Sequence, residues 1–153
     1  GNALGILDER DVKAAKEALE LCDMADKKNR EFKSLSGGEK RLALAARAIA
    51  QDSLVMLLDE PSAFLDIGHQ AKIFGILKAS RDKGKTVIMV THDINAAFDI
   101  ADNVILMSGG KVIASGNTDT VLTEENIRGA YGFDKFGLAD NPETGKKSIF
   151  LKI

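Results

Sequence analysis

Two neighbouring carboxylates, Asp59 and Glu60, are the side chains of this sequence best placed to do chemistry. They follow an apolar run, residues 54–58 (LVMLL), whose lack of alternation predicts a strand buried on both faces. In open α/β sheets, ligands bind at the carboxyl ends of strands, where both carboxylates would lie. One carboxylate can hold Mg²⁺ while the other accepts a proton from water. The alternative interpretation is a strand that simply ends in a polar loop.

A glycine-rich helix start is the second candidate. Residues 35–39 read LSGGE and precede a helical pattern. The amides of Gly37 and Gly38, beside the positive end of the helix dipole, would suit a phosphate. The alternative is that Ser36 and Glu39, three residues apart, form a capping box without any ligand.

The two histidines receive different interpretations. His92 follows a second apolar run, residues 86–90, so it is also predicted at the carboxyl end of a strand. An imidazole there can hydrogen-bond a phosphate oxygen, although a lone histidine is more often structural. His69 lies near a helix start with no partner in view, and we expect it at the surface.

The elements that must position these residues alternate between helix and strand. We predict helices at 11–22 (with Asp11 as N-cap), from 37 onward, and at 66–81, 94–101, 118–122 and 124–131. We predict strands at 54–58, 86–90, 104–107, 112–114 and 148–153, and a solvated basic loop at 27–33. This alternation predicts an α/β fold with buried parallel strands flanked by helices.

Composition excludes several classes of protein. The chain has 153 residues, enough for one ordinary domain, and its net charge of −2 argues against a nucleic-acid-coating protein. A single cysteine excludes an internal disulfide framework and fits a reducing compartment. The longest apolar run is far shorter than the roughly 20 residues of a membrane-spanning helix.

Together these pieces resemble the nucleotide-binding subunits of ABC transporters. Residues 35–39 resemble the ABC signature, residues 54–61 the Walker B strand with its trailing Glu, residues 62–66 the D-loop, and His92 the switch histidine. The resemblance implies the C-terminal part of an ABC-type, P-loop NTPase-like nucleotide-binding domain with a helical-subdomain remnant. Residues 1–38 would hold the end of the helical subdomain and the signature loop, residues 39–116 the α/β core, and residues 117–153 the C-terminal helices and tail.

The resemblance also implies roles. Asp59 would hold Mg²⁺ through water, Glu60 would polarise the attacking water, and His92 would contact the γ-phosphate. The signature residues would contact ATP held by a second ATP-binding subunit; they are Ser36, Gly37, Gly38 and Glu39. Asp66 would lie at that dimer interface.

Neither the phosphate loop (Walker A) nor the glutamine loop of the family precedes Leu35. Residues 79–86 (ASRDKGKT) imitate a phosphate loop, but a helix is predicted before them and a strand after them, which reverses the order that phosphate binding needs. We therefore expect an ordinary turn there. The chain starts at Gly1 without Met, and we expect it to be part of a longer subunit that alone binds Mg·ATP poorly and hydrolyses it negligibly.

The tail is similar to the C-termini of importer ATPases for iron–siderophore, haem and cobalamin. Its matching segments are residues 116–127, 131–132 and 141–145. This resemblance implies an ATPase bound peripherally at the cytoplasmic face of the membrane, with permease subunits and, indirectly, a substrate-binding protein as partners and no nucleic acid.

Two other functions fit part of the pattern. A chromosome-maintenance or DNA-repair ATPase keeps signature and Walker B apart from the phosphate loop, but residues 11–24 lack the sustained heptads of the coiled coil that precedes them there. A degenerate, non-catalytic subunit would have no chemical reason to keep Glu60 and His92.

Overall fold

A computed structural model describes residues 8–152, which form two compact units, one ending at Val90 and the other beginning at Thr91. Two parts of the predictions lie outside the described residues. They are residues 1–7, the start of the predicted segment 1–38, and Ile153, the last residue of the predicted strand 148–153. None of the described helices is both long and apolar enough to cross a bilayer.

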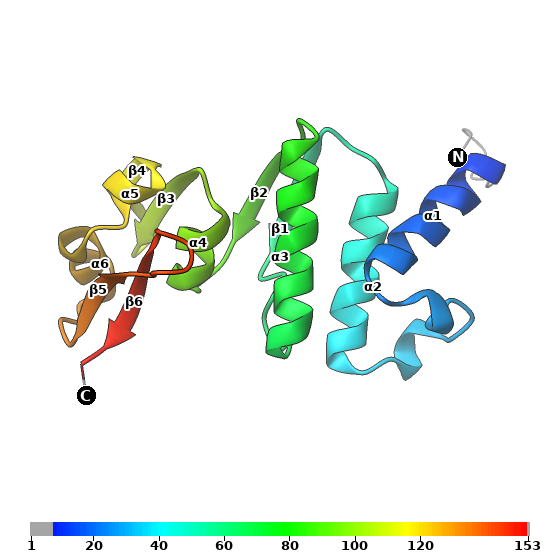
Figure 1. Ribbon diagram of the computed structural model, residues 1–153, viewed down its shortest axis with the longest axis horizontal. Coiled ribbons are helices and arrows are strands. Elements are labelled where there is room, and N and C mark those ends of the chain that lie inside the picture. The colour runs from blue at the N-terminus through cyan, green and yellow to red at the C-terminus, as the bar shows by residue number, and fades with distance from the viewer. Residues whose placement is uncertain (1–7, 153) are drawn as a thin grey trace. The chain divides into compact units, whose positions relative to one another are not determined.

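Helix α1 (Glu9–Leu21) opens the first unit (Figure 1). The prediction of Asp11 as its N-cap was wrong, because the helix begins earlier and Asp8 is the cap. The amide of Asp11 donates to Oδ1 of Asp8, and the amide of Asp8 donates to Oδ2 of Asp11, both at 2.9 Å. This reciprocal pair satisfies two amides that no helical carbonyl can reach, so it sets the start of the helix.

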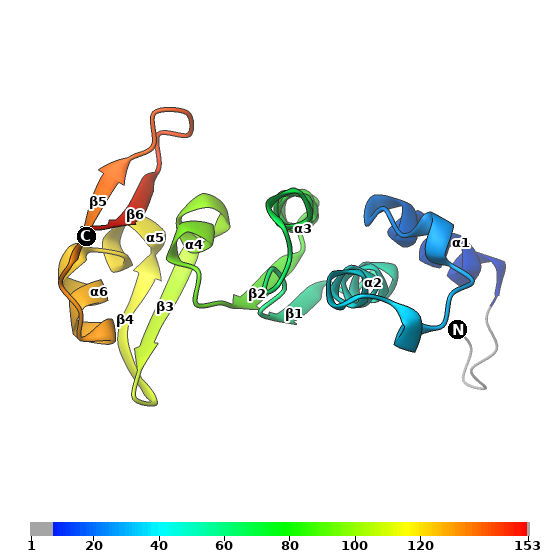
Figure 2. The ribbon, with the colours of Figure 1, turned by 90° about the horizontal axis from the view of Figure 1, so that it is seen from below.

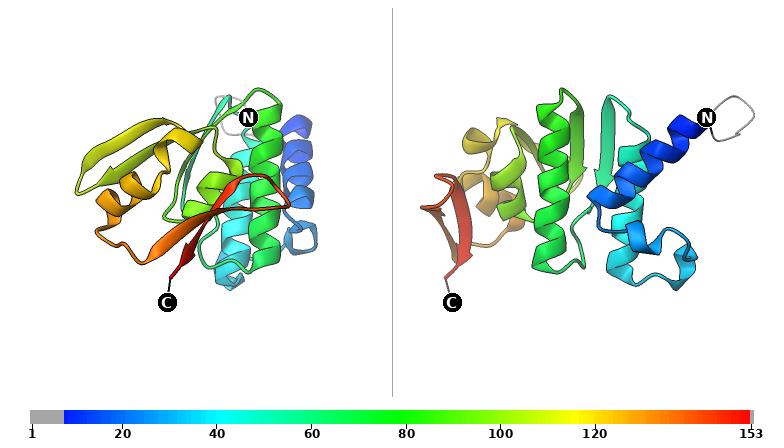
Figure 3. Two further views of the ribbon diagram at one scale, coloured as in Figure 1. Left: turned by 60° about the vertical axis from the view of Figure 1, so that its left-hand side comes forward. Right: turned by 45° about the vertical axis from the view of Figure 1, so that its right-hand side comes forward.

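Helix α2 (Gly37–Ala50) lies beside α1, as Figure 3 shows. Its buried residues Leu42 and Ala46 are four positions apart, so they lie on one face of the helix. The predicted basic loop before it, residues 27–33, overlaps a short 3₁₀ turn at each end, η1 (Ala25–Lys27) and η2 (Phe32–Ser34). The loop therefore has local structure that composition did not predict.

The strands β1 (Val55–Asp59) and β2 (Thr86–Val90) pair in parallel, with Val55 opposite Thr86 and Asp59 opposite Val90. Helix α3 (Ile67–Asp82) makes the crossover between them (Figure 1). The predicted helix–strand order and parallel pairing are confirmed. Both carboxyl ends lie at one edge, so Asp59 and Glu60 stand where ligands of such sheets bind.

The prediction that β1 is buried on both faces was wrong for the described residues. Met56 is 4% exposed, whereas Val55 and Leu57 on the opposite face are 50% and 73% exposed. The neighbouring Ile88 and Val90 of β2 are 51% and 61% exposed. Alternate side chains of a strand point to opposite faces, and no element of the described part of this unit covers the second face.

Residues 79–86 form the expected turn rather than a phosphate loop. Helix α3 ends at Asp82, and β2 begins at Thr86. Gly84 between them has φ +84°, a left-handed conformation that glycine adopts without a steric cost. Because the helix precedes the strand, the turn lies at a helix C-terminus, where the dipole disfavours anions.

The second unit, as described from Thr91 to residue 152, contains two hairpins and three helices. Strands β3 (Asn103–Ser108) and β4 (Lys111–Asn117) cover the two predicted strands at 104–107 and 112–114 and form a hairpin, and α5 (Thr118–Val121) and α6 (Glu124–Tyr131) pack against it (Figure 2). Helix α4 (Ile94–Ile100) precedes them. The core consists of buried side chains from α4, β3, the end of α5, α6 and the segment after α6: Phe98, Leu106, Val121, Leu122, Ile127 and Phe136.

Strand β5 (Phe136–Asp140) was not predicted, whereas its partner β6 (Lys147–Leu151) was. The two are antiparallel, with Phe136 opposite Leu151. The segment FGLAD shows no alternation, and its Gly137 disfavours a strand on propensity. A Cβ at Gly137 would lie 2.6 Å from the Phe150 ring of β6, so a larger residue here would require that ring to shift. The contact with the partner strand therefore favours glycine at this position.

Candidate nucleotide site

The glycine-rich helix start is a complete capping box. The amide of Glu39 donates to Oγ of Ser36 at 3.2 Å, and the amide of Ser36 donates to Oε2 of Glu39 at 2.8 Å. The structure thus contains the arrangement that sequence reasoning gave as the ligand-free alternative. An added Cβ would meet nothing within 4 Å at Gly37, whereas at Gly38 it would lie 3.4 Å from Leu65. The backbone at Gly37 is therefore open to a ligand, and that at Gly38 faces the loop before α3.

Several charged groups interact at the start of α2. The Ser36 amide beside Glu39 lowers the pKa of that carboxyl, with a further contribution from Lys27. Nζ of Lys27 lies 3.6 Å from Glu39 and 2.9 Å from Asp26, and its hydrogen bond to Asp26 raises the pKa of Lys27. Lys27, expected in a solvated loop, is an ion-pair partner of the signature residue Glu39.

Asp59 and Glu60 end β1 in different environments. Asp59 is the last residue of the strand and shares the exposed face of Val55 and Leu57. Glu60 is half-buried, has a left-handed φ of 47°, and donates its amide to the Val90 carbonyl at 2.9 Å. Its own carbonyl accepts from the Ala63 amide at 3.2 Å and from Nη1 of Arg41 at 2.6 Å. The peptide that follows Glu60 is thus held from two sides.

A single exposed carboxylate is a fitting donor for Mg²⁺, which keeps several waters and binds proteins through one or two carboxylates. Asp59 meets that requirement at the end of β1. Within residues 8–152, no three His, Cys, Asp or Glu side chains gather into a metal-binding group. An ion held here would therefore need oxygen ligands from water and from a bound phosphate.

The loop after β1 is tied to the first turns of α3. Nε2 of Gln70 donates to the carbonyls of Ser62 and Leu65 at 3.3 and 3.2 Å, and Ser62 is buried. Asp66 is the N-cap of α3, accepting from the His69 amide at 3.0 Å, and its second oxygen lies 2.5 Å from Nδ1 of His69. The expectation that His69 has no partner was wrong, because the N-cap spacing brings the two side chains together.

A hollow of about 490 Å³ in the first unit is lined by residues of the capping box of α2 and of the loop before α3. Its lining comes from the segment after α1, from η1, from the start of α2, and from the loop before α3 with the first turn of that helix: Asp23, Met24, Lys27, Ser36, Gly38, Glu39, Leu42, Phe64, Leu65, Asp66 and His69. The hollow therefore unites the predicted Ser36, Gly38, Glu39 and Asp66. Sequence reasoning missed Lys27 and His69 as members; the spacing of His69 from a capping Asp was the available signal.

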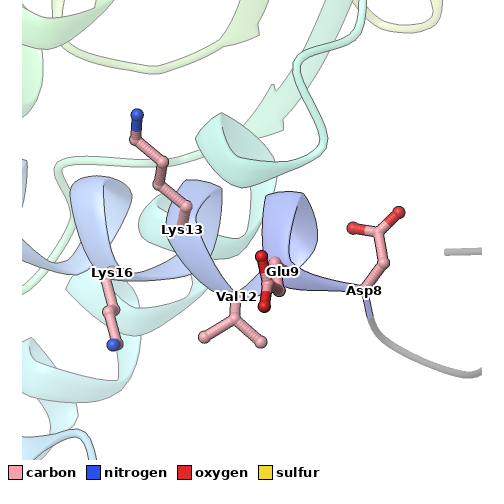
Figure 4. Close-up of a pocket in the computed structure, with 5 residues that line it drawn as sticks. All are labelled: Asp8, Glu9, Val12, Lys13 and Lys16. Carbon is pink, nitrogen blue, oxygen red and sulfur yellow. The ribbon is translucent and has the colours of Figure 1, made fainter.

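A second hollow, of about 410 Å³, lies on α1 and joins none of the motifs. Its lining residues all belong to the first turns of one helix or its cap, and Figure 4 shows Lys13 pointing away from Val12 and Lys16. Val12, its one apolar member, is 41% exposed. This hollow offers no converging polar groups for a ligand.

His92 belongs to the second unit, directly before α4. It is exposed, and the residues on either side of it hold the backbone. The Asp93 amide donates to Oγ1 of Thr91 at 3.1 Å, and Oδ1 of Asp93 caps α4 by accepting from the Ala96 amide at 3.0 Å. The backbone around His92 is thus held by the side chains of Thr91 and Asp93.

Comparison with known proteins defines the class. A family described as "AAA domain, putative AbiEii toxin, Type IV TA system" matches residues 2–99, and the chain belongs to this family. A solved structure described as an inward-facing metal-chelate type ABC transporter has 30% identity and a TM-score of 0.82, covering 98% of this chain and 60% of its own. A dimeric bacterial ABC transporter cassette has 32% identity and a TM-score of 0.67, covering 74% and 50%. The fold is thus part of an ABC cassette, as predicted.

Curated proteins narrow the resemblance to ATP-binding proteins of metal importers. A hemin import ATP-binding protein of Rhodococcus jostii is 36% identical over 88% of this chain and 46% of its own length. An iron(3+)-hydroxamate import protein of Bacillus subtilis is 34% identical over 95% and 54%. A manganese transport ATP-binding protein of Listeria innocua is 37% identical over 85% and 55%. The predicted resemblance is confirmed over most of the chain, which spans about half the length of these relatives.

Proposed function

We propose that this chain is the signature and Walker B part of an ATP-binding and ATP-hydrolysing subunit of an importer, with a metal chelate such as an iron–siderophore or haem as cargo. The main support for the proposal is that residues of the signature-like, Walker B-like and D-loop-like segments line one hollow or contact one another within the first unit. Ser36, Gly38 and Asp66 line one hollow, and Arg41 of the signature helix holds the Glu60 peptide at the end of β1. Names of the relatives support the cargo class.

The proposed chemistry assigns one task to each group. When bound, Mg²⁺ supplies positive charge that offsets the charge of the reacting phosphates. Asp59 would hold the ion through water, Glu60 would accept a proton from the attacking water, and His92 would donate a hydrogen bond to the γ-phosphate. Ser36 and the amides of Gly37 and Gly38 would bind the γ-phosphate of ATP carried by a second subunit, with Asp66 at the interface between them.

The partners and location follow from the same proposal. Two ATP-binding subunits would close on ATP and drive permease subunits between their states from the cytoplasmic face, while a substrate-binding protein selects the cargo. Residues 1–38 would hold the end of the helical subdomain and the signature loop, residues 39–116 the α/β core, and residues 117–153 the C-terminal helices and tail. The support for a dimer is the dimeric cassette among the similar structures.

The test measures ATP turnover and ATP-dependent association of the complete subunit to which this chain is proposed to belong. Replacing Glu60 by Gln should reduce turnover by about 10²–10⁴-fold, the usual contribution of a general base, while association driven by ATP persists. The matched control is Glu125→Gln on α6, which should leave both unchanged. Turnover that survives Glu60→Gln would contradict the role of Glu60 as base.

The purified 153-residue chain gives a second test, because the family's phosphate loop has no counterpart in it. Calorimetry should detect weak Mg·ATP binding, and phosphate release should stay at background. Measurable turnover by this chain that Glu60→Gln abolishes would contradict the expectation that it is inactive alone.

A further inference from the structure

Arg41 joins the signature helix to both ends of the turn that carries Glu60. Its Nη1 donates to the Glu60 carbonyl at 2.6 Å, and its guanidinium carbon lies 5.4 Å from the centre of the Phe64 ring. A hydrogen bond from a charged donor is stronger than one between neutral groups, and a guanidinium over an aromatic ring adds an electrostatic attraction. One half-buried side chain of α2 thus contacts both residues that bound the turn.

The turn itself has a conformation that needs such support. Glu60 and Phe64 have left-handed φ angles of 47° and 63°, although neither is glycine. Backbones of this kind persist only where their surroundings hold them, and they concentrate at functional sites. Further supports include backbone hydrogen bonds from Glu60 to Val90 and from Ala63 to Glu60, and the two bonds from Gln70.

We propose that Arg41 is a positioning residue, which aims the carboxylate of Glu60 by fixing the peptide after it and so couples that aim to the position of helix α2. The proposal rests on the proposed role of Glu60 as base. The direction of a side chain depends on the φ and ψ angles of its own residue, and rotation of the Glu60 carbonyl would break the bond to Arg41. Pro61 fixes the next φ, so the adjustable angle in this peptide lies at Glu60.

Movement of α2 would therefore reach the base directly. The start of α2 holds the residues proposed to bind ATP of the second subunit, and Arg41 lies one turn further along the same helix. A shift of this helix carries the guanidinium with it, and the Glu60 carbonyl must follow or lose its donor. Since an arginine stays charged at all ordinary pH values, this link does not depend on pH.

The experiment compares Arg41→Met, which removes the donors but keeps length, with Arg41→Lys, which keeps one charge. The control is Arg47→Met, at an exposed arginine near the end of the same helix. The first readout is NMR of the 153-residue chain, with the Glu60 side-chain carboxyl signal assigned through Glu60→Gln. Arg41→Met should move this signal and speed the exchange of the Ala63 amide by at least tenfold. Arg41→Lys should have an intermediate effect, and Arg47→Met should have none.

The second readout is ATP turnover of the complete subunit to which this chain is proposed to belong. Arg41→Met should lower kcat by about tenfold or more with KM unchanged, because it misdirects the base without removing a contact to ATP. If Arg41→Met fails to fold, the comparison of Arg41→Lys with Arg47→Met decides by the same signals. This proposal is overturned if Arg41→Met leaves both the Glu60 signal and kcat unchanged although Glu60→Gln still abolishes turnover. Turnover that survives Glu60→Gln would overturn the proposed function instead.

Discussion

The carboxylate of Asp66 binds both the backbone and the ring of His69. Oδ1 accepts from the His69 amide at 3.0 Å, as an N-cap does, and Oδ2 lies 2.5 Å from Nδ1. The His69 amide, followed by the His69 ring, lowers the pKa of Asp66. A D-loop aspartate proposed for a dimer interface is therefore held in place within its own subunit before any partner binds.

This pair predicts how acid affects the first unit. Because the pKa of Asp66 is lowered in the folded state, its stabilising contribution is present above the ordinary pKa of an aspartate and is lost as pH falls through the lowered value. Asp66→Asn, which can still cap the helix, should flatten this acid limb in plots of urea midpoint against pH. Asp140→Asn, an exposed aspartate of β5, is the control. An acid limb as steep in Asp66→Asn as in the wild type would contradict the assignment.

Two helix N-caps allow the contribution of a cap to stability to be distinguished from a role in ATP binding. Ser36 caps α2 and Thr123 caps α6, each accepting from a backbone amide at 3.2 Å. Ser36→Ala and Thr123→Ala should each lower the free energy of unfolding by about 1 kcal/mol in urea titrations. Only Ser36→Ala should also weaken ATP-dependent association, because its hydroxyl is proposed to bind phosphate. Equal loss of association in both variants would show that instability alone is responsible.

The core of the second unit should be sensitive at Ile127. This side chain is 1% exposed and packs with Phe98, Leu106 and Phe136. Ile127→Ala should lower the free energy of unfolding by about 2–5 kcal/mol through lost burial and a cavity. The control is Ile105→Ala, at a side chain that is 64% exposed, which should change it by less than about 0.5 kcal/mol. Similar losses in calorimetric or urea measurements would place the core elsewhere.

The single thiol should be unreactive in the folded protein. Cys22 is 0% exposed, and its burial raises the pKa of the thiol to about 11, with Lys72 acting in the opposite direction. The nucleophile is the thiolate, so reaction with a disulfide reagent at pH 8 should be far slower in the native state than in urea. A native rate close to the unfolded rate would mean that the end of α1 opens readily.

Local sequence was sufficient to predict much of the fold and to select the candidate site residues. Helical periodicity located the helices, and two short uninterrupted apolar runs located the parallel strands. The three-residue spacing of Ser36 and Glu39 indicated the capping box as an alternative, and the order of helix before strand predicted the turn at residues 79–86. The resemblance to ABC ATP-binding proteins also needed only the order of short motifs, and the comparisons confirmed it.

Features that depend on contacts between distant residues could not be read in this way. Strand β5 exists because β6 pairs with it, and its Gly137 makes room for Phe150. The exposure of Leu57 depends on what packs over the sheet, which the apolar run does not encode. The bond of Arg41 to a peptide 19 positions away, and the left-handed Glu60 it holds, arise only when α2 packs beside the end of β1. Residue types set which groups can react, whereas folding sets their neighbours, because contacts between distant segments carry no local pattern.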